Sequence, residues 1–263
     1  MSMLFNHFMQ SVRKPDHWLY GSWLDTVVRY RKMRLGMLWL LIPTVVYIWV
    51  IGGFLVSMQP GIDKARFFAH IGIGYTIFRM VAAVMSDATS VFAGYQYFIY
   101  DGNQRLTDFI LRNLARSFYY FLLTMPLVMA VAIASPDFDL AGIPLAVAGL
   151  AVVLVNLFSF SVVLSIAGAR FPDLSELMGS IMMAAFLITP VVWYPQAAPE
   201  DTASGVFMRA NPFHHLLLAI RAPLLGETID ASSWVYLPVM TVTGLIAAAV
   251  TYRLYARRVA VWL

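Results

Sequence analysis

The chain has 263 residues, of which 60% are hydrophobic and 12% charged, with a net charge of +4 and a mean hydropathy of +0.74. Soluble domains carry about 25% charged residues, so this composition excludes an ordinary soluble fold and indicates an integral membrane protein. The absence of cysteine excludes disulfides, thiolate catalysis and cysteine-ligated metal sites. The cations flank apolar runs instead of forming a patch, so they do not indicate nucleic-acid binding.

The N-terminal part predicts a surface helix followed by a first membrane span. Residues 1–17 are polar and mixed, and we expect them to be partly disordered. Residues 18–31 predict an amphipathic helix with tryptophans beside cations, a pattern typical of the headgroup region. This helix could be an anchor alone or could also dock a cytoplasmic partner. The stretch Arg29–Ser57 opens with four cations and continues as a long uncharged run, which predicts a cytoplasmic N-terminus.

Hydropathy predicts an all-α integral membrane fold with six transmembrane helices. The predicted spans are about 35–57, 67–92, 118–135, 143–168, 175–195 and 234–256. Between the last two, Asn211-Pro212 divides an apolar stretch into pieces too short to cross, which predicts an external re-entrant hairpin or interfacial helices. Six spans place both termini on one side. The inside segments hold 13 Lys and Arg residues and the outside loops hold 4, which predicts cytoplasmic termini.

These predictions divide the chain into three parts. Residues 1–34 are the cytoplasmic N-terminus with its interface helix, residues 35–256 are the transmembrane domain, and residues 257–263 are a short cytoplasmic tail.

Two charged residues fall inside the second predicted span. Arg79 and Asp87 are eight residues apart, about 12 Å along a helix, so they cannot pair with each other and each needs a partner elsewhere. Charges at this depth normally face a bundle interior or a water-filled cavity. For Arg79, structural pairing and direct contact with a ligand both remain open.

Aromatic residues are the richer class of side chain near the spans. Sugars stack their apolar faces on aromatic rings, so these residues are candidates for contact with a glycan, although an aromatic residue near a span more often faces lipid or anchors the interface. Together with Arg79, the channel candidates are Tyr47, Phe54, Tyr75, Phe78, Trp193 and Tyr194.

The longest cytoplasmic connection is residues 93–117. Asp101-Gly102 marks a turn, and a short helix is predicted from about Asn103 to Arg116. This helix could be a lever gripped by a soluble subunit or an ordinary interfacial loop helix.

The motifs of several enzyme classes are missing. The sequence has no GxxxxGK[ST] loop for ATP phosphates, no GxSxG and no convincing nucleophile–base arrangement. His214 and His215 are adjacent and lack a ligand spacing, so no metal site is predicted. We therefore expect no catalytic residue and no cofactor in this chain.

Four stretches resemble the permease subunit of type-2 ABC transporters, in the branch that exports capsular polysaccharide and O-antigen. They are the basic entry to the first span, the cytoplasmic segment, the turn leading into the fifth span, and the external hairpin. In order, they are RYRKMRLGMLWLLIPT (29–44), YDGNQRLTDFILR (100–112), ARFPDLSELMGSIMMAAFLITPVVWYP (169–195) and NPFHHLLLAIRAPLLG (211–226).

The resemblance implies a homodimer of permeases with two copies of a separate nucleotide-binding subunit, which would hold ATP and Mg²⁺. It implies a substrate path at the dimer interface, lined by spans one and five, and a gate helix at residues 18–31. Coupling to the ATPase would fall on Asn103, Arg105, Asp108 and Arg112, and on Phe171, Asp173 and Glu176 in a second contact. The hairpin would narrow the exit, with Asn211, Pro212, His214 and His215 as gate candidates.

The expected function is therefore that of the permease subunit of an ATP-driven exporter in a bacterial inner membrane. It would move a lipid-linked polysaccharide, in contact with membrane lipid and without nucleic acid, while the partner hydrolyses ATP. The alternatives are a type-2 ABC exporter of teichoic acid, lipid or drug, or a secondary transporter. The sequence leaves the glycan, its lipid carrier, chain-length control and the partners of Arg79 and Asp87 open.

Overall fold

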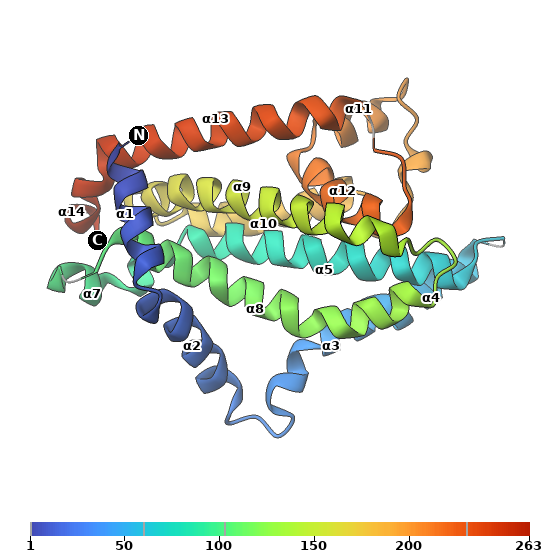
Figure 1. Cartoon of the computed structure of the whole chain (residues 1–263), viewed down its shortest axis with the longest axis horizontal. Helices are drawn as coiled ribbons and strands as arrows, with labels where there is room; N and C mark the ends of the chain where they lie inside the picture. Colours follow the sequence, from blue (N-terminus) through green and yellow to red (C-terminus); the bar gives the residue numbers. More distant parts are fainter. Residues whose placement is uncertain (1, 60, 103, 230) are drawn as a thin grey trace.

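A computed structural model describes residues 2–59, 61–102, 104–229 and 231–263. Over these residues the fold is helical throughout and contains no strand, which confirms the all-α class. Long helices lie side by side, and both termini lie at the same end of the bundle (Figure 1). We call this the terminal end and the other the far end.

The α-helices follow one another along the chain with short connections. Their bounds are α1 Ser2–Arg13, α2 Gly21–Tyr30, α3 Ile42–Val45, α4 Gly52–Met58, α5 Lys64–Ala88, α6 Val91–Gly94, α7 Gln96–Asp101, α8 Leu106–Ile133, α9 Ile143–Arg170, α10 Leu174–Ile188, α11 Ala203–Ala210, α12 Pro212–Leu225, α13 Ala231–Tyr255 and α14 Val259–Trp262.

Five helical segments are long and apolar enough to cross a membrane. They are Gly36–Met58, Lys64–Ala88, Leu106–Ile133, Leu140–Arg170 and Ala231–Trp262, and they overlap the predicted spans at 35–57, 67–92, 118–135, 143–168 and 234–256, although the second ends at Ala88, before the predicted boundary. The first of these is irregular: a 3-10 turn at Gly36–Leu40 precedes α3, and a π-helical stretch at Val46–Ile51 separates α3 from α4.

The predicted fifth span differs from the structure. Its helix, α10, has 15 residues and ends at Ile188. At about 1.5 Å per residue it is about 22 Å long, less than the roughly 30 Å of a bilayer core. Thr189 is extended, with ψ 134°, because the residue before a proline disfavours the helical region. The prediction of a helix to residue 195 missed the effect of Pro190.

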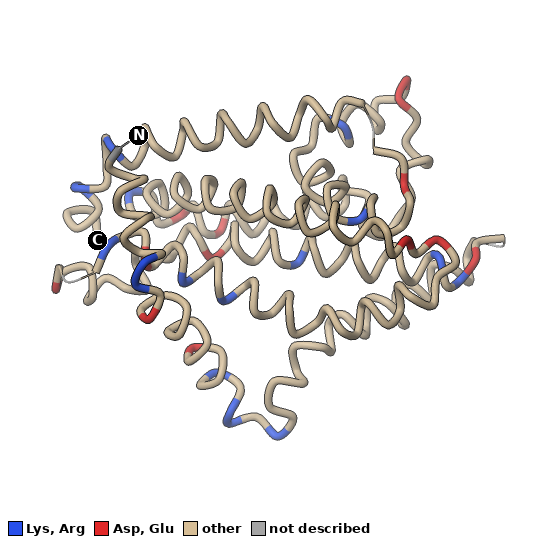
Figure 2. The backbone as a smooth tube through the Cα atoms, in the orientation of Figure 1, with Lys and Arg blue, Asp and Glu red and all other residues tan. Residues whose placement is uncertain are grey.

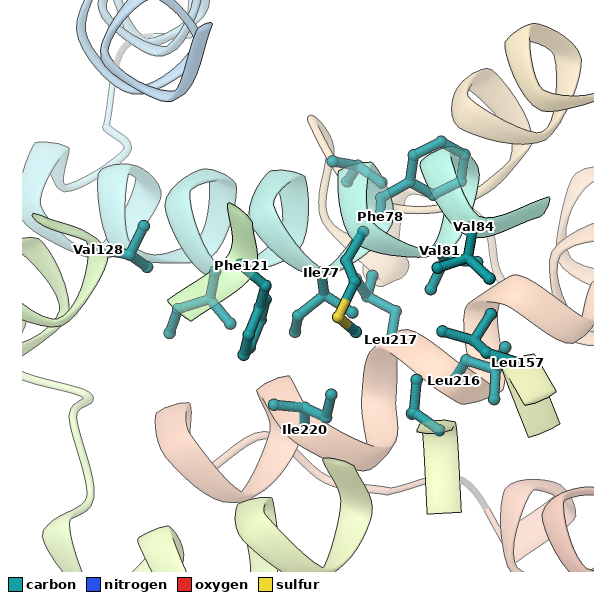
Figure 3. Packing of buried hydrophobic residues seen from close by; sticks show 14 of the residues in the cluster. Ile77, Phe78, Val81, Val84, Phe121, Val128, Leu157, Leu216, Leu217 and Ile220 are labelled. Carbon is teal, nitrogen blue, oxygen red and sulfur yellow. The ribbon is translucent and has the colours of Figure 1, made fainter. Parts of the chain in front are cut away.

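Helix α5 is the centre of the bundle. Most of its side chains are buried, and it packs against α8, α9, α10 and α12. Figure 3 shows the hydrophobic core around α5, where Ile77, Phe78, Val81 and Val84 meet side chains from neighbouring helices. Those neighbours include Phe121 and Val128 of α8, Leu157 of α9, and Leu216, Leu217 and Ile220 of α12.

The cytoplasmic segment also differs from the prediction. The structure has one continuous helix, α8 (Leu106–Ile133), where a short helix at 103–116 and a separate span at 118–135 are predicted. Its first turn is stabilised by Asp108, whose Oδ2 accepts from the Arg105 backbone N–H at 3.0 Å. The helix that precedes the turn at Gly102 is α7, which the sequence analysis did not predict.

The apolar stretch after α10 breaks where the sequence predicts. Asn211 caps α12, its Oδ1 accepting from Phe213 N at 3.0 Å, and Pro212 occupies the first turn. Nearly all of α12 is buried against α9 and α5, so it lies inside the bundle. The two elements approach so closely that a Cβ at Gly142, which directly precedes α9, or at Gly149 within α9 would collide with the backbone of α12.

The N-terminal segment is more ordered than predicted. Residues that were expected to be partly disordered form α1, which packs on α13 and α8. Within the stretch 18–31, for which an amphipathic helix is predicted, the structure has α2, preceded by a π-helical turn. Its buried face is polar, with Ser22 and Thr26, while Leu24 and Val28 are exposed. An apolar outward face is what a helix in contact with lipid requires.

Candidate functional site

The predicted coupling residues on α8 are engaged inside the subunit. Arg105 Nε donates to Gln10 Oε1 at 2.9 Å, which ties α8 to α1. Asp108 is only 3% exposed and caps α8. Arg112 contacts Asp25 of α2. Asn103, the fourth predicted residue of this set, lies outside the described residues.

The contact of Arg112 with Asp25 is bidentate and ties the amphipathic helix to the bundle. Nε and Nη2 of Arg112 donate to the two carboxylate oxygens of Asp25, each at 2.7 Å. Tyr95, just before α7, donates its hydroxyl to Asp25 at 3.2 Å, and the guanidinium lies 5.0 Å from its ring centroid. We call Asp25, Tyr95 and Arg112 the clamp; it joins α2, α8 and the segment that leads to α7.

Electrostatics favour the ionised clamp. Burial alone would raise the pKa of Asp25, but the hydrogen bonds and positive charge of Arg112 outweigh it and hold the pKa below its ordinary value. The same burial raises the pKa of the Tyr95 phenol, so it remains a hydrogen-bond donor at neutral pH.

The terminal end exposes a group of aromatic side chains that the sequence analysis did not assign. Tyr97 is 79% exposed, and Phe98 and Tyr100 on the same short helix are also exposed. Phe171, in the predicted second contact, is 60% exposed, and Asp173 and Glu176 are exposed beside it. The signal for α7 is the run QYFIY before the Asp101-Gly102 turn, which places aromatic residues where hydropathy predicts a cytoplasmic loop.

The two charges within the second span find separate partners. Asp87 pairs with Arg116 of α8, with Oδ2 and Nη2 2.8 Å apart. Arg79 donates from Nη1 to the backbone carbonyl of Leu40 at 2.9 Å, at the start of the first span. Both charges therefore join α5 to a neighbouring element.

Three of the channel candidates come together with one residue that the sequence analysis did not single out. Tyr47 stacks on Tyr75 with ring centroids 3.8 Å apart, and Phe186 of α10 lies 5.7 Å from Tyr47 and 5.3 Å from Phe78. This aromatic cluster links the first span, α5 and α10. Phe54 is 62% exposed and lies outside it.

The other two channel candidates lie at the far end, close to an ion pair in which the arginine is buried and the glutamate is 22% exposed. Arg221 of α12 is fully buried; its Nε donates to Glu227 at 3.0 Å and its Nη1 to Pro190 O at 2.6 Å. The ring nitrogens of His70 lie 3.1 Å from Glu227 Oε1 and 3.0 Å from Trp193 O. Tyr194 packs on His70, with ring centroids 4.5 Å apart.

We call His70, Arg221 and Glu227 the far-end network. Burial would raise the pKa of Glu227, but the charge of Arg221 and the hydrogen bond from His70 lower it to about 2. No sequence motif marks this network, because His70 lies more than a hundred residues before Arg221 and Glu227 in the chain.

The predicted gate residues contribute to local structure at the far end. Besides capping α12, Asn211 donates from Nδ2 to Thr189 Oγ1 at 2.8 Å, with Pro212 next to it in the first turn. His215 is buried, with ring nitrogens 2.8 Å from Ser233 Oγ and 2.7 Å from Arg209 O. His214 is buried and lines a pocket. Across the described part of the chain, no group of three His, Cys, Asp or Glu residues is arranged to hold a metal ion.

Comparison with known proteins gives one informative match. No protein-family model matches the chain. It is 22% identical over 228 residues to the O-antigen export system permease protein RfbA of Myxococcus xanthus, a match that covers 84% of this chain and 85% of that protein. The match thus confirms, over most of the chain, the resemblance to a polysaccharide-export permease that the four motifs indicate.

Proposed function

We propose that this chain is the membrane-spanning subunit of an ATP-driven exporter that moves a lipid-linked polysaccharide, O-antigen or capsule, across a bacterial inner membrane. It works as a homodimer with two copies of a soluble ATPase, which binds ATP and Mg²⁺. The observation that carries the proposal is the similarity to an O-antigen export permease along most of both chains. Five helices long enough to span a membrane support it.

The proposed topology has six crossings with both termini in the cytoplasm. In it, α10 and the non-helical residues that follow complete the fifth crossing together. The position of both termini at one end of the bundle supports an even number of crossings (Figure 1). Figure 2 shows many Lys and Arg residues toward the terminal end, as expected for the cytoplasmic side.

The ATPase docks on the terminal end, at α7 and the turn Phe171–Glu176. The exposed aromatic side chains of α7 supply the apolar contact that interfaces favour, while the α8 residues first predicted for this role act behind it. Tyr95 connects the docking segment to Asp25 and Arg112. The clamp therefore passes movement of α7 to α2, the proposed gate helix.

The glycan path runs along the first span and α10. Both helices leave large apolar side chains uncovered within the subunit, including Trp49 and Phe54 on the first and Met183 and Leu187 on the second. A second subunit facing these helices would enclose a passage, with the aromatic cluster of Tyr47, Tyr75, Phe78 and Phe186 beneath its wall. Stacking on aromatic residues suits a polymer that must slide.

A gene-deletion strain tests the proposal. The strain should lose long-chain surface polysaccharide and accumulate lipid-linked glycan on the cytoplasmic side, and the wild-type gene should restore export. Normal surface glycan in the deletion strain would contradict the proposed function. Export restored by this chain in a strain that lacks every soluble ATPase partner would instead indicate a secondary transporter.

A further inference from the structure

The far end holds a polar pocket that none of the proposed roles uses. Its volume is about 550 Å³, within the 300–1,000 Å³ range of typical ligand sites. Several segments of the chain contribute residues to its lining. They include the start of α5, the loop between α8 and α9, the residues after α10 and the residues after α12. Its lining includes none of the residues of the aromatic cluster that we place along the proposed path between two subunits.

One wall of the pocket is fixed before any ligand arrives. His70 is 1% exposed and lines the pocket while its ring is held by Glu227 and by the carbonyl of Trp193. Glu227 also lines the pocket and is held by the fully buried Arg221. A wall of side chains with fixed positions reduces the entropy cost of binding.

The charges around the pocket are paired. Arg66 lies 3.4 Å from Asp137 and Arg209 lies 3.4 Å from Glu200, and all four line the cavity. Figure 2 shows both signs of charge among the loops of this end. Arg221 balances the charge of Glu227, so the lining offers no excess of positive charge for a phosphate. Among the described residues, no three His, Cys, Asp or Glu side chains are grouped so that they could hold a metal ion.

The remaining lining mixes apolar side chains, among them Leu218 and Leu225, with neutral polar groups and the aromatic ring of Tyr194. Gln196 and Thr228 are exposed and line the cavity, as does Tyr194. Amide and hydroxyl groups both donate and accept hydrogen bonds, which suits a ligand rich in hydroxyls, and an aromatic ring suits the apolar face of a sugar.

We propose that this pocket binds a neutral sugar unit of the exported polysaccharide at the far end of each subunit. The inference rests on the proposed function, because it takes the exported glycan as the ligand. A site here would hold a segment of the polysaccharide after that segment has crossed the membrane. It would hinder the polysaccharide from sliding back.

The test uses the full chain in lipid nanodiscs and, as probe, the polysaccharide released by mild acid from the host's own lipopolysaccharide. Saturation-transfer NMR titration measures Kd. Gln196→Trp and Thr228→Trp each place an indole in the cavity without removing any hydrogen bond of the far-end network. Gln59→Trp, at an exposed position of the same end outside the lining, is the matched control.

We expect both pocket variants to weaken binding about tenfold or more, and the control to bind as the wild type does. No binding by the wild type, or equal binding by all four proteins, would overturn the inference. A deletion strain that still exports its glycan would overturn the proposed function itself. If export does depend on this protein but the pocket binds no glycan, only the inference about the pocket is overturned.

Discussion

The two ends of the bundle both use an arginine–carboxylate pair, in different surroundings. At the far end, Arg221 is fully buried and joins α12 to the loops beside it. At the terminal end, the side chains of Arg112 and Asp25 are 20% and 32% exposed, and their pair joins α2 to α8. A buried pair that loses one partner leaves an uncompensated charge, whereas a partly hydrated pair can open at low cost. The comparison identifies the far end as the fixed part and the terminal end as the part suited to movement.

The largest effect is expected from removing the buried arginine. Arg221→Met leaves Glu227 without its ion pair and Pro190 O without its donor, so it should lower the free energy of unfolding by about 3–5 kcal/mol. Thermal unfolding in detergent measures the loss. Arg66→Met is the control, because its pair with Asp137 is half-exposed and should be worth about 0–1 kcal/mol. Equal losses of unfolding free energy in the two variants would show that the buried arginine does not hold the far end in place.

Acid should weaken the far end through Glu227. The folded pKa of about 2 lies below the ordinary 4.5, so ionised Glu227 stabilises the fold above pH 4.5, and this contribution disappears as the pH falls toward 2. The shift corresponds to on the order of 3 kcal/mol. Unfolding temperatures of wild type and Glu227→Gln should converge across this pH range. A difference that stays constant with pH would contradict the assignment.

Close packing of α9 on α12 should make a single methyl group costly. Gly149→Ala forces the two backbones apart and should destabilise the fold by about 1–3 kcal/mol. Gly179→Ala is the matched control, because it lies in α10 with open space around it and alanine favours a helix. Denaturation of both variants gives the comparison, and an equally stable Gly149→Ala would disprove the close approach.

The clamp should matter less for global stability than for local protection. A double-mutant cycle of Asp25→Asn and Arg112→Ala should give a coupling of about 1 kcal/mol, and hydrogen exchange should accelerate in α2 and not in α5. Arg116→Ala, which breaks the pair with Asp87 of α5, should leave α2 unchanged. Faster exchange in α2 after Arg116→Ala would remove the special role of the clamp.

The smallest effect on stability, with a large effect on function, is expected on α7. Tyr97→Ala should change the unfolding free energy by less than about 0.5 kcal/mol, because the side chain is exposed, yet it should lower ATPase binding. Leu140→Ala, at a residue 71% exposed on the other end, should leave ATPase binding intact. A pull-down of the ATPase with each variant distinguishes a docking surface from an ordinary exposed loop.

Hydropathy and proline placement predicted much of the fold, because both act locally. The long apolar runs predicted the five helices that are long enough to span a membrane, and Asn211-Pro212 predicted the break before α12. The continuity of α8 was not predicted, because the charged residues in its first turns indicated a cytoplasmic connection and not part of a span. In the structure Arg112 and Arg116 are neutralised by Asp25 and Asp87, residues distant in sequence, and so the helix runs through them.

The sites were harder to predict than the fold. His70 is a single histidine in an apolar run, and its partners lie more than a hundred residues away in the chain. Pairs such as Tyr47 with Tyr75 became visible once the spans were placed side by side. Charge guided the prediction of the coupling residues, whereas exposed aromatic side chains mark α7, the segment that we propose for docking.

Reconstitution tests the central claim most directly. The tagged chain is purified from its host with whatever soluble subunits accompany it, placed in proteoliposomes with lipid-linked glycan, and supplied with ATP and Mg²⁺. The account predicts a soluble ATPase in equal amount to the chain, and glycan that crosses the bilayer when ATP is hydrolysed. Glycan that crosses equally well without the ATPase, or a chain that never retains one, would contradict it.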